Sequence, residues 1–369
     1  MYLKLYLLVL ICFSVSSVAL AQVKPPNEKE EVIRVETQLV DVPIAVTDPK
    51  GLPVRGLKSS NFIVYEDGKP QEIAEFAATS APFEVALLLD TSGSTRNDLL
   101  LIRRAASDFI AGLRPGDRVA VIGFNTERKG GQAYAVSEII TRLTDDRALL
   151  RTAIEKVRES NGTPYYDSLL QVAEKVFAQR PTDEFRGRRA LVALTDGVDS
   201  SSAFDFELAK EELTQVGAMA FMIKVDTREF FEQNLLGDCQ TAIRFSTAQI
   251  RRYYKSIIAK PNMEKTNDFC QLGEFERLAI SKRLYEIADS EMNELAKLSG
   301  GKVFPVDDFN EARSAFKRVA DEIGTKYTLT YYPSNNKKDG SHRTIKVELK
   351  GLPAGSQVRA REGYTAPTN

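Results

Sequence analysis

The middle of the chain, residues 82–325, alternates short apolar runs with amphipathic stretches, and this alternation restricts the possible folds most. The apolar runs have the length of buried strands, and the stretches between them have helical spacing. Strands that alternate with helices form a parallel sheet with helices on both faces. We therefore expect an α/β fold with a doubly wound, mostly parallel sheet. The predicted strands are Val85–Leu89, Val119–Phe124, Ala190–Leu194, Ala218–Val225 and Lys302–Val306, and the predicted helices are Asp98–Gly112, Asp145–Arg158, Tyr165–Gln179, Phe204–Val216, Leu284–Ser299 and Asn310–Ile323.

The two ends of the chain have a different pattern, in which short strands are separated by turns. This pattern covers an N-terminal β module, residues 32–80, and a C-terminal segment, residues 326–365. Isolated hairpins are marginally stable in water, so we expect the strands of both ends to pack together as one small β-sandwich. The predicted strands include Ile33–Thr47, Phe62–Tyr65, Ile73–Phe76, Tyr327–Tyr332, Thr344–Leu349 and Val358–Arg361.

Side chains with oxygen atoms lie at the ends of two predicted strands of the middle region. Asp90, Ser92 and Ser94 follow the predicted strand Val85–Leu89, and Asp196 follows the predicted strand Ala190–Leu194. Thr163 lies in a Gly-Thr-Pro loop that opens a predicted helix. Ligands of open parallel sheets bind beyond the carboxyl ends of the strands, and oxygen atoms suit a hard divalent cation. These residues are therefore the candidate metal ligands.

Taken alone, the run from Asp90 to Ser94 is more simply a turn that caps the helix from Asp98. The whole set, however, resembles the metal-ion-dependent adhesion site of von Willebrand factor A domains, which have a Rossmann-like fold. That pattern is Asp-x-Ser-x-Ser, then a loop Thr, then an Asp after a later strand, and all its positions match here. The resemblance implies that Ser92 and Ser94 bind the cation directly and Thr163 directly or through water. It implies that Asp90 and Asp196 act mainly through water or outside the first shell, and that the cation is most simply Mg²⁺, with Mn²⁺ or Ca²⁺ as alternatives.

The strands on either side of the middle region add to this resemblance. The predicted strand on the N-terminal side is similar to a Val-x-Val-x-Val-x-Asp pattern. This pattern is matched by Val42, Val46 and Asp48, with Ile44 at the position of the middle Val. A Tyr-x-Leu-x-Tyr-x-Pro pattern is matched from Tyr327 to Pro333. Both patterns resemble those of secreted bacterial proteins that carry a von Willebrand factor A-related domain of the acidobacterial type.

The N-terminal residues resemble a secretion signal. Lys4 precedes the apolar run from Leu5 to Leu20, which ends in a small-x-small cleavage pattern at Ala21. We therefore predict a signal peptide at residues 1–21, cleavage near Ala21/Gln22, and a flexible lead-in at residues 22–31. An uncleaved membrane anchor is the alternative. No later apolar stretch is long enough to span a bilayer, so we expect a secreted or periplasmic protein.

A long polar segment, residues 228–282, interrupts the rhythm of strands and helices and is interpreted as a partly helical insertion within the domain of residues 82–325. It contains Cys239 and Cys270, the cysteines that remain after removal of a signal peptide. An oxidising compartment would allow a disulfide between them, and two unpaired buried thiols are the alternative. The run Arg251–Lys255 either contacts an acidic partner or forms a solvated helix face.

Charge and the candidate site favour binding over catalysis. The 50 Lys and Arg residues balance 51 Asp and Glu residues, so nucleic-acid binding is not expected. A cation held mostly by neutral hydroxyls keeps part of its charge, which favours an Asp or Glu carboxylate of a partner protein as a further ligand. We therefore expect an extracytoplasmic adhesion or protein-binding module, not an enzyme. The chain's single His, His342, has no Gly-x-Ser-x-Gly motif upstream that would make it the base of a serine hydrolase.

Two alternatives remain open. In the first, the protein is a structural subunit of an envelope assembly, and the metal only stiffens the loops. In the second, it is a phosphoryl-transfer enzyme that acts through Asp90, although Ser92 stands where such a phosphatase has a second acid. The sequence makes no prediction of the oligomeric state.

Overall fold

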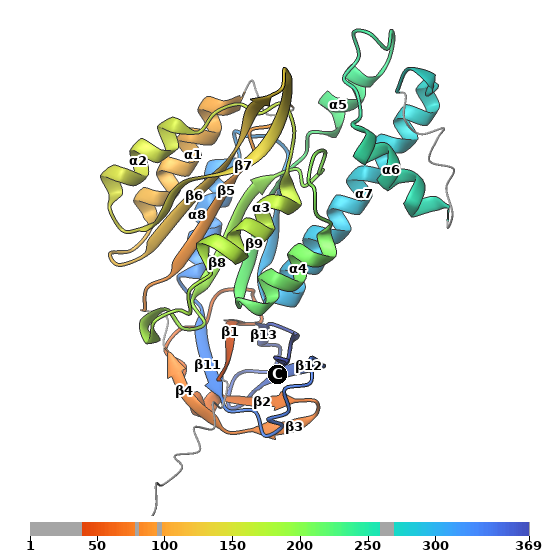
Figure 1. Cartoon of the computed structure of the whole chain (residues 1–369). Coiled ribbons are helices and arrows are strands. Elements are labelled where there is room, and N and C mark those ends of the chain that lie inside the picture. Colours follow the sequence, from red (N-terminus) through yellow and green to blue (C-terminus); the bar gives the residue numbers. More distant parts are fainter. Residues whose placement is uncertain (1–38, 78–80, 94–97, 259–268, 369) are drawn as a thin grey trace, which may run out of the picture. The chain divides into compact units, whose positions relative to one another are not determined.

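A computed structural model describes residues 39–77, 81–93, 98–258 and 269–368. The predicted signal peptide, the lead-in and Ser94 lie outside these ranges. The α/β region contains a mixed sheet in the order β10-β9-β8-β5-β6-β7, in which the only antiparallel pair among the described strands is β6 with β7 (Figure 1). The prediction of a mostly parallel sheet is thus confirmed. Its strands are β5 (Glu84–Leu89), β6 (Arg118–Lys129), β7 (Gln132–Thr144), β8 (Arg189–Thr195), β9 (Ala218–Val225) and β10 (Lys302–Val306).

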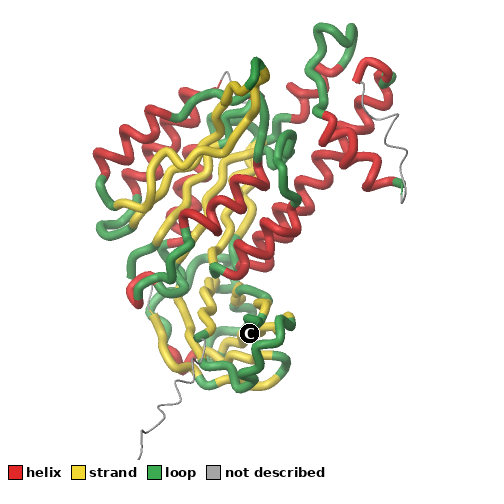
Figure 2. The backbone as a smooth tube through the Cα atoms, viewed as in Figure 1, coloured by secondary structure: helices red, strands yellow, loops and turns green. Residues whose placement is uncertain are grey.

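Helices cover both faces of this sheet (Figure 2). Strand β5 shows why, because all its residues are apolar after Glu84 and all are buried. Val85, Leu87 and Leu89 pack into one core and Ala86 and Leu88 into the other, as the alternation of side chains along a strand requires. The first core includes α1 (Leu99–Gly112), α2 (Arg147–Lys156) and α8 (Ala312–Ile323), and the second includes α3 (Tyr165–Gln171), α4 (Phe206–Gln215) and α7 (Glu274–Ser299).

Strand β7 and the start of α7 were not predicted. Strand β7 is half exposed at the sheet edge, so it lacks the continuous apolar run that marked the central strands. It joins β6 through Gly130 and Gly131, whose positive φ angles of 60° and 82° suit a tight hairpin turn. Helix α7 begins at Glu274, earlier than the predicted Leu284.

Two antiparallel sheets combine strands from both ends of the chain, as predicted. Their inner faces share one apolar core, to which Val42 and Val64 contribute from the N-terminal part and Leu329 and Val347 from the C-terminal part. One sheet has the order β13 (Gln357–Ala360), β1 (Val40–Thr47), β11 (Tyr327–Tyr331) and β4 (Ile73–Ala77), and the other β14 (Gly363–Thr365), β12 (His342–Leu349), β2 (Phe62–Glu66) and β3 (Lys69–Gln71).

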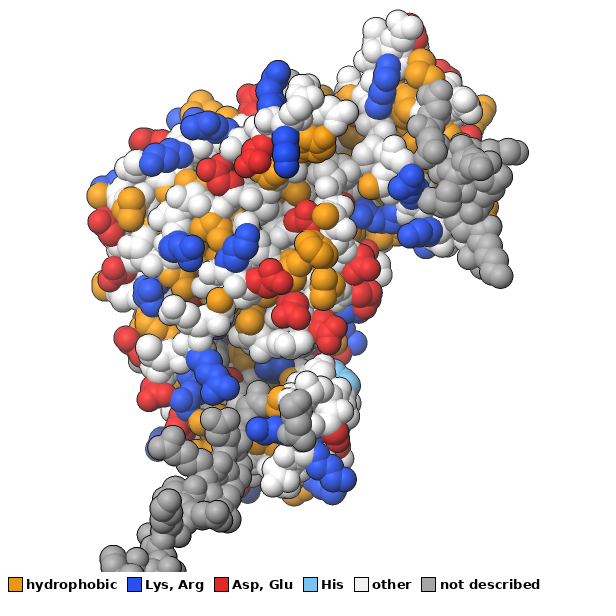
Figure 3. All heavy atoms as spheres, viewed as in Figure 1, with side chains coloured by type: hydrophobic (Ala, Val, Ile, Leu, Met, Phe, Trp, Pro, Cys, Tyr) orange, Lys and Arg blue, Asp and Glu red, His pale blue; other side chains and the backbone are white. Residues whose placement is uncertain are grey.

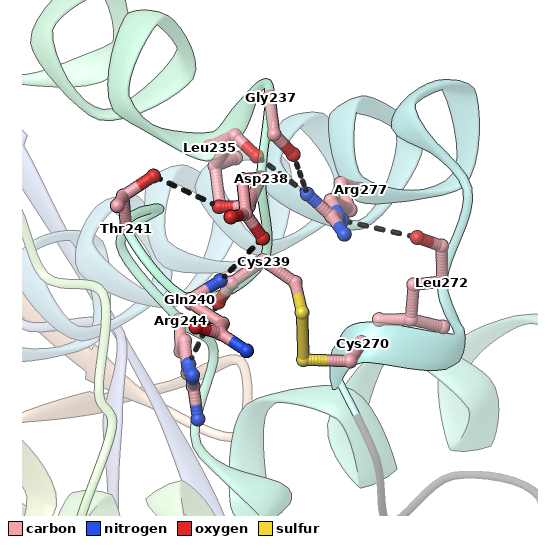
Figure 4. Close-up of a disulfide and its surroundings, with 10 residues drawn as sticks. All are labelled: Leu235, Gly237, Asp238, Cys239, Gln240, Thr241, Arg244, Cys270, Leu272 and Arg277. Atoms are coloured by element: carbon pink, nitrogen blue, oxygen red, sulfur yellow. Dashed lines mark hydrogen bonds between the residues drawn. A yellow bond between two sulfur atoms is a disulfide. The ribbon is translucent and has the colours of Figure 1, made fainter.

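The insertion forms α5 (Arg228–Leu235), α6 (Thr247–Ile257) and the first part of α7. These helices bury a separate apolar cluster that includes Leu235, Phe245 and Ile250. Cys239 and Cys270 form a disulfide beside this cluster (Figure 4). The Arg277 guanidinium donates to the carbonyls of Leu235, Gly237 and Leu272 at 3.0–3.1 Å, which ties the segment after α5 to the start of α7. Along the described ranges, no helix is both long and apolar enough to cross a membrane.

Candidate functional site

Asp90 lies directly after β5 and is fully buried. Its amide donates to the Leu194 carbonyl at 2.9 Å, which continues the pairing of β5 with β8. Its carboxylate accepts a 2.6 Å hydrogen bond from the Thr195 hydroxyl and a 3.0 Å bond from the amide of Ser92. Burial raises the pKa of Asp90 above its ordinary value of 3.8, against the lowering effect of these hydrogen bonds. Ser92 is also buried, and both residues follow the last residue of β5, Leu89, as the sequence predicted.

Thr163 lies in the loop before α3 and is buried. This loop is bound to the segment after β5, because the amide of Ser160 donates to the Thr91 carbonyl at 2.8 Å. It is also bound to the segment after β8. The Thr163 amide donates to Oγ of Ser200 at 2.8 Å, and the Ser200 amide donates to the Thr163 carbonyl at 3.0 Å. The loops after β5, before α3 and after β8 are therefore neighbours.

Asp196 follows β8 and is 6% exposed. Its Oδ1 accepts a 2.9 Å hydrogen bond from the amide of Val198, and its Oδ2 accepts a 2.6 Å bond from the Thr227 hydroxyl. The Thr227 oxygen lies 2.8 Å from the hydroxyl of Tyr285 on α7. The Thr227 hydroxyl donates its single proton to Asp196, so the Tyr285 hydroxyl is the donor in its hydrogen bond to Thr227. A chain of hydroxyls thus orients one carboxylate oxygen of Asp196.

Asp199 fixes the next part of the same loop. Its carboxylate accepts a 2.9 Å bond from the amide of Tyr165, at the start of α3, and a 3.1 Å bond from Arg252 on α6. Burial raises the pKa of Asp199, and the Arg252 guanidinium opposes that change. Asp199 thus binds the start of α3, whereas the carboxylate of Asp205 caps α4 by accepting from the Leu208 amide at 3.1 Å.

These loops offer oxygen donors that suit a hard cation. Ser92 and Thr163 supply hydroxyls, and Asp90 and Asp196 supply carboxylates, all at one edge of the sheet. Among the described residues, no group of three or more His, Cys, Asp or Glu side chains could hold a metal ion. A cation here would therefore need hydroxyl or water ligands besides carboxylates, as Mg²⁺, Mn²⁺ and Ca²⁺ accept. The residues present fit such an ion.

Several residues that shape the site were not predicted. Thr195 and Thr227 follow the same rule as the predicted ligands, because both lie at carboxyl ends of parallel strands, and that rule could have found them. Tyr285 and Arg252 lie on helices far along the chain. No local sequence signal pairs them with the loop after β8.

Acidic and basic side chains lie on different parts of the surface near the insertion. Figure 3 shows acidic side chains gathered over α4 and the adjoining part of α7, and basic side chains on the insertion near α6. Within the run Arg251–Lys255, Arg251 and Lys255 are exposed. Arg252 instead turns to Asp199 and lies 4.7 Å from the ring centroid of Tyr166. Arg252 thus makes contacts within the domain, whereas Arg251 and Lys255 lie at the surface.

The family model of the von Willebrand factor type A domain matches residues 85–198. This segment contains β5, β6, β7 and β8 and every candidate ligand from Asp90 to Asp196. The resemblance to von Willebrand factor type A domains is thus confirmed for residues 85–198. No curated protein sequence matches the chain.

Several solved structures are similar to the chain. Proximal thread matrix protein 1 from the mussel byssus is 15% identical with a TM-score of 0.42, and the match covers 70% of this chain and 50% of that one. A second structure of that protein has a zinc-occupied MIDAS motif (13% identity, TM-score 0.41, 65% and 48% covered). A von Willebrand factor type A protein from Catenulispora acidiphila is 13% identical (TM-score 0.40, 91% and 75% covered). The pilus adhesin SpaC from Lactobacillus rhamnosus GG is 10% identical (TM-score 0.41, 85% and 48% covered). The chain thus spans about half the length of the first of these structures.

Proposed function

We propose that the protein is a secreted or periplasmic binding module that captures a carboxylate of a partner protein through a divalent cation. The observation that carries this proposal is the hydrogen-bonded ring of loops that presents Asp90, Ser92, Thr163 and Asp196 at one sheet edge within a von Willebrand factor type A domain. Domains of this family are typically interaction modules. Ser94 completes the proposed ligand set from the sequence pattern.

The ligand chemistry favours recognition of an anion. Neutral hydroxyls of Ser92, Ser94 and Thr163 would leave much of the charge of Mg²⁺ uncompensated, and an Asp or Glu carboxylate is a strong hard-oxygen ligand for such an ion. Asp90 and Asp196 are already engaged by Thr195 and Thr227, which suits a role through water or beside the ion. Binding of this kind requires no chemical step.

Cation binding is the first test. Isothermal titration of the full chain with MgCl₂ or MnCl₂ should detect one saturable site, and Asp196→Ala should weaken it at least tenfold. Asp226→Ala is the matched control, because Asp226 follows the neighbouring strand β9 and pairs with Arg228. The proposal fails if the wild-type chain binds neither ion, or if both variants bind as the wild type does.

Partner capture is the second test, and it separates adhesion from a purely structural metal. Proteins recovered from the native envelope by the wild-type chain should be lost with EDTA and with Asp196→Ala. Amidation of the recovered partner's carboxylates should also abolish capture. A chelator that lowers the Tm but leaves the recovered proteins unchanged would support the structural-subunit alternative.

Export is tested separately. Expression of the full chain with its N-terminus should yield an extracytoplasmic protein whose first residue, by mass spectrometry, is near Gln22. An intact N-terminus in the cytoplasmic fraction would contradict this part of the proposal.

A further inference from the structure

The insertion and its two junctions contact the loop after β8 at several independent points. We propose that Thr227, Tyr285 and Arg252 are positioning residues for this loop, so that the insertion sets the cation affinity of the candidate site. This inference rests on the proposed function, because it assumes that Asp196 acts at a cation. It adds residues that neither the family pattern nor the strand-end motifs from Asp90 to Asp196 contain.

The first contact holds Asp196 itself. Thr227 is the residue before α5, and its hydroxyl donates to Oδ2 of Asp196 at 2.6 Å. Tyr285, on the part of α7 that follows the insertion, donates to Thr227 at 2.8 Å. Thr227 is 6% exposed and Tyr285 7% exposed, so water competes little for these bonds. Together with the Val198 amide on Oδ1, they fix the plane of the Asp196 carboxylate.

The second contact holds the loop three residues later. Arg252 on α6 donates to the backbone carbonyl of Asp199 at 3.0 Å and to its carboxylate at 3.1 Å. The guanidinium also lies over the ring of Tyr166, on α3. A charged group that binds both the main chain and the side chain of one residue restricts the loop more than a single bond would.

The third contact is apolar and links the loop to the core of the insertion. Val198, between Asp196 and Asp199, packs against the cluster that contains Leu235, Phe245 and Ile250. The disulfide between Cys239 and Cys270 closes the insertion beside the same cluster. The loop after β8 is therefore held by a hydroxyl chain, a guanidinium and an apolar contact, all from the insertion or its junctions.

Residues that orient a metal ligand can change the metal affinity although they do not coordinate the metal themselves. Residues that hydrogen-bond to metal ligands fix their geometry, and their loss typically lowers metal affinity roughly 10- to 100-fold. We expect Thr227→Val to weaken Mn²⁺ binding to the full chain by this factor, and Thr227→Ser, which keeps the hydroxyl, to restore most of it. Tyr285→Phe should weaken binding less, because Thr227 keeps its bond to Asp196.

Arg252 offers a test with a matched control on the same helix. Arg252→Gln should raise the Kd for Mn²⁺, whereas Arg251→Gln, at the exposed neighbouring position, should leave it unchanged. Titration calorimetry and Mn²⁺ electron paramagnetic resonance would measure the affinity, and circular dichroism with apo-protein Tm would report the fold. If Thr227→Val does not fold, Arg252→Gln carries the test, since its side chain is 23% exposed.

The outcomes separate this inference from the proposed function. If the wild-type chain binds no Mn²⁺, the proposed function fails and this inference fails with it. If the wild type binds and Asp196→Ala does not, the cation site that the proposed function requires is present. In that case equal affinity of Thr227→Val, Arg252→Gln and the wild type would overturn the positioning role. The same holds if Thr227→Ser is no better than Thr227→Val.

Discussion

Thr195 and Asp90 join the two central strands of the α/β sheet at the candidate site, because the Thr195 hydroxyl donates a 2.6 Å hydrogen bond to Oδ2 of Asp90. Both residues are fully buried. The Thr195 oxygen also accepts a 2.9 Å bond from the amide of Gly197, in the turn that follows Asp196. One hydroxyl therefore orients a carboxylate after β5 and the main chain after β8.

Replacement of Thr195 by Val tests this arrangement. Valine has nearly the same shape, but it leaves a buried carboxylate and a buried amide each short of one partner. We expect the free energy of unfolding to fall by about 2 kcal/mol, measured by urea denaturation. Thr195→Ser keeps the hydroxyl and should lose much less. Equal stability of the two variants would contradict the role assigned to this hydrogen bond.

The sheet and the strand-end positions of the candidate ligands could be predicted because they depend on local patterns. Strands β5 and β8 are short apolar runs buried on both faces, and each is followed directly by an oxygen-bearing segment. The half-exposed edge strand β7 carries no such pattern, and it was missed. The length of α7 was also missed, because its first part packs against the insertion and not against the sheet.

The residues that orient the site depend on contacts between distant segments. Arg252 stands in a basic run that suggested a surface, yet it reaches Asp199 across 53 positions of the sequence. Tyr285 reaches Thr227 across 58 positions. Neither pair has a spacing or a residue type that identifies it in advance. The strand-end positions of the candidate ligands could therefore be predicted, whereas the residues that contact them required the structure.

Gly301 allows a close approach of two backbones. A Cβ atom at this position would lie 1.8 Å from the carbonyl oxygen and 2.5 Å from the carbonyl carbon of Ala220, in the buried strand β9. Main-chain atoms of a central strand cannot move aside as a flexible side chain can. We expect Gly301→Ala to lower the free energy of unfolding by about 3 kcal/mol or more.

Gly112, at the end of α1, is the control for Gly301. A Cβ atom there meets nothing within 4 Å, so Gly112→Ala should change stability by at most about 1 kcal/mol, in the stabilising direction. Urea midpoints of both variants measure the difference. Similar midpoints would show that the segment around Gly301 moves away from β9 at little cost.

The disulfide between Cys239 and Cys270 closes a loop with a sequence separation of 31. The chain-entropy model gives about 3–4 kcal/mol for a loop of this length. We expect the double variant Cys239→Ser/Cys270→Ser to open mainly at α5 and α6, because these helices share a separate apolar cluster with the start of α7. Hydrogen exchange should become faster there than in β5 and β8.

Reduction of the wild-type protein provides the control for this double variant. Dithiothreitol should reproduce the exchange pattern of the variant in the wild type and should have no effect on the variant itself. A uniform increase of exchange over the insertion and the central sheet would contradict the separate stability of the insertion.

Glu291 on α7 gives the protein a pH-dependent stability. It accepts a 2.6 Å hydrogen bond from the hydroxyl of Tyr166, yet burial raises its pKa from 4.5 to about 7. Arg252 lowers this pKa, whereas Asp199 and Glu207 raise it. The folded chain therefore binds more protons than the unfolded chain between these two pH values. The stabilisation is complete below pH 4.5 and is lost as the pH rises through about 7.

The variant Glu291→Gln removes this titration. We compare the free energy of unfolding of the wild type with that of the variant at each pH. The wild-type value minus the variant value should fall by about 2 kcal/mol as the pH rises from 4.5 to 7. Urea denaturation at several pH values measures this difference. Glu286→Gln is the control, because Glu286 is an exposed acid on the same helix that pairs with Arg283 at 3.2 Å, and this variant should follow the wild type. Parallel curves for the wild type and Glu291→Gln would show that Glu291 is ionised alike in the folded and unfolded chains.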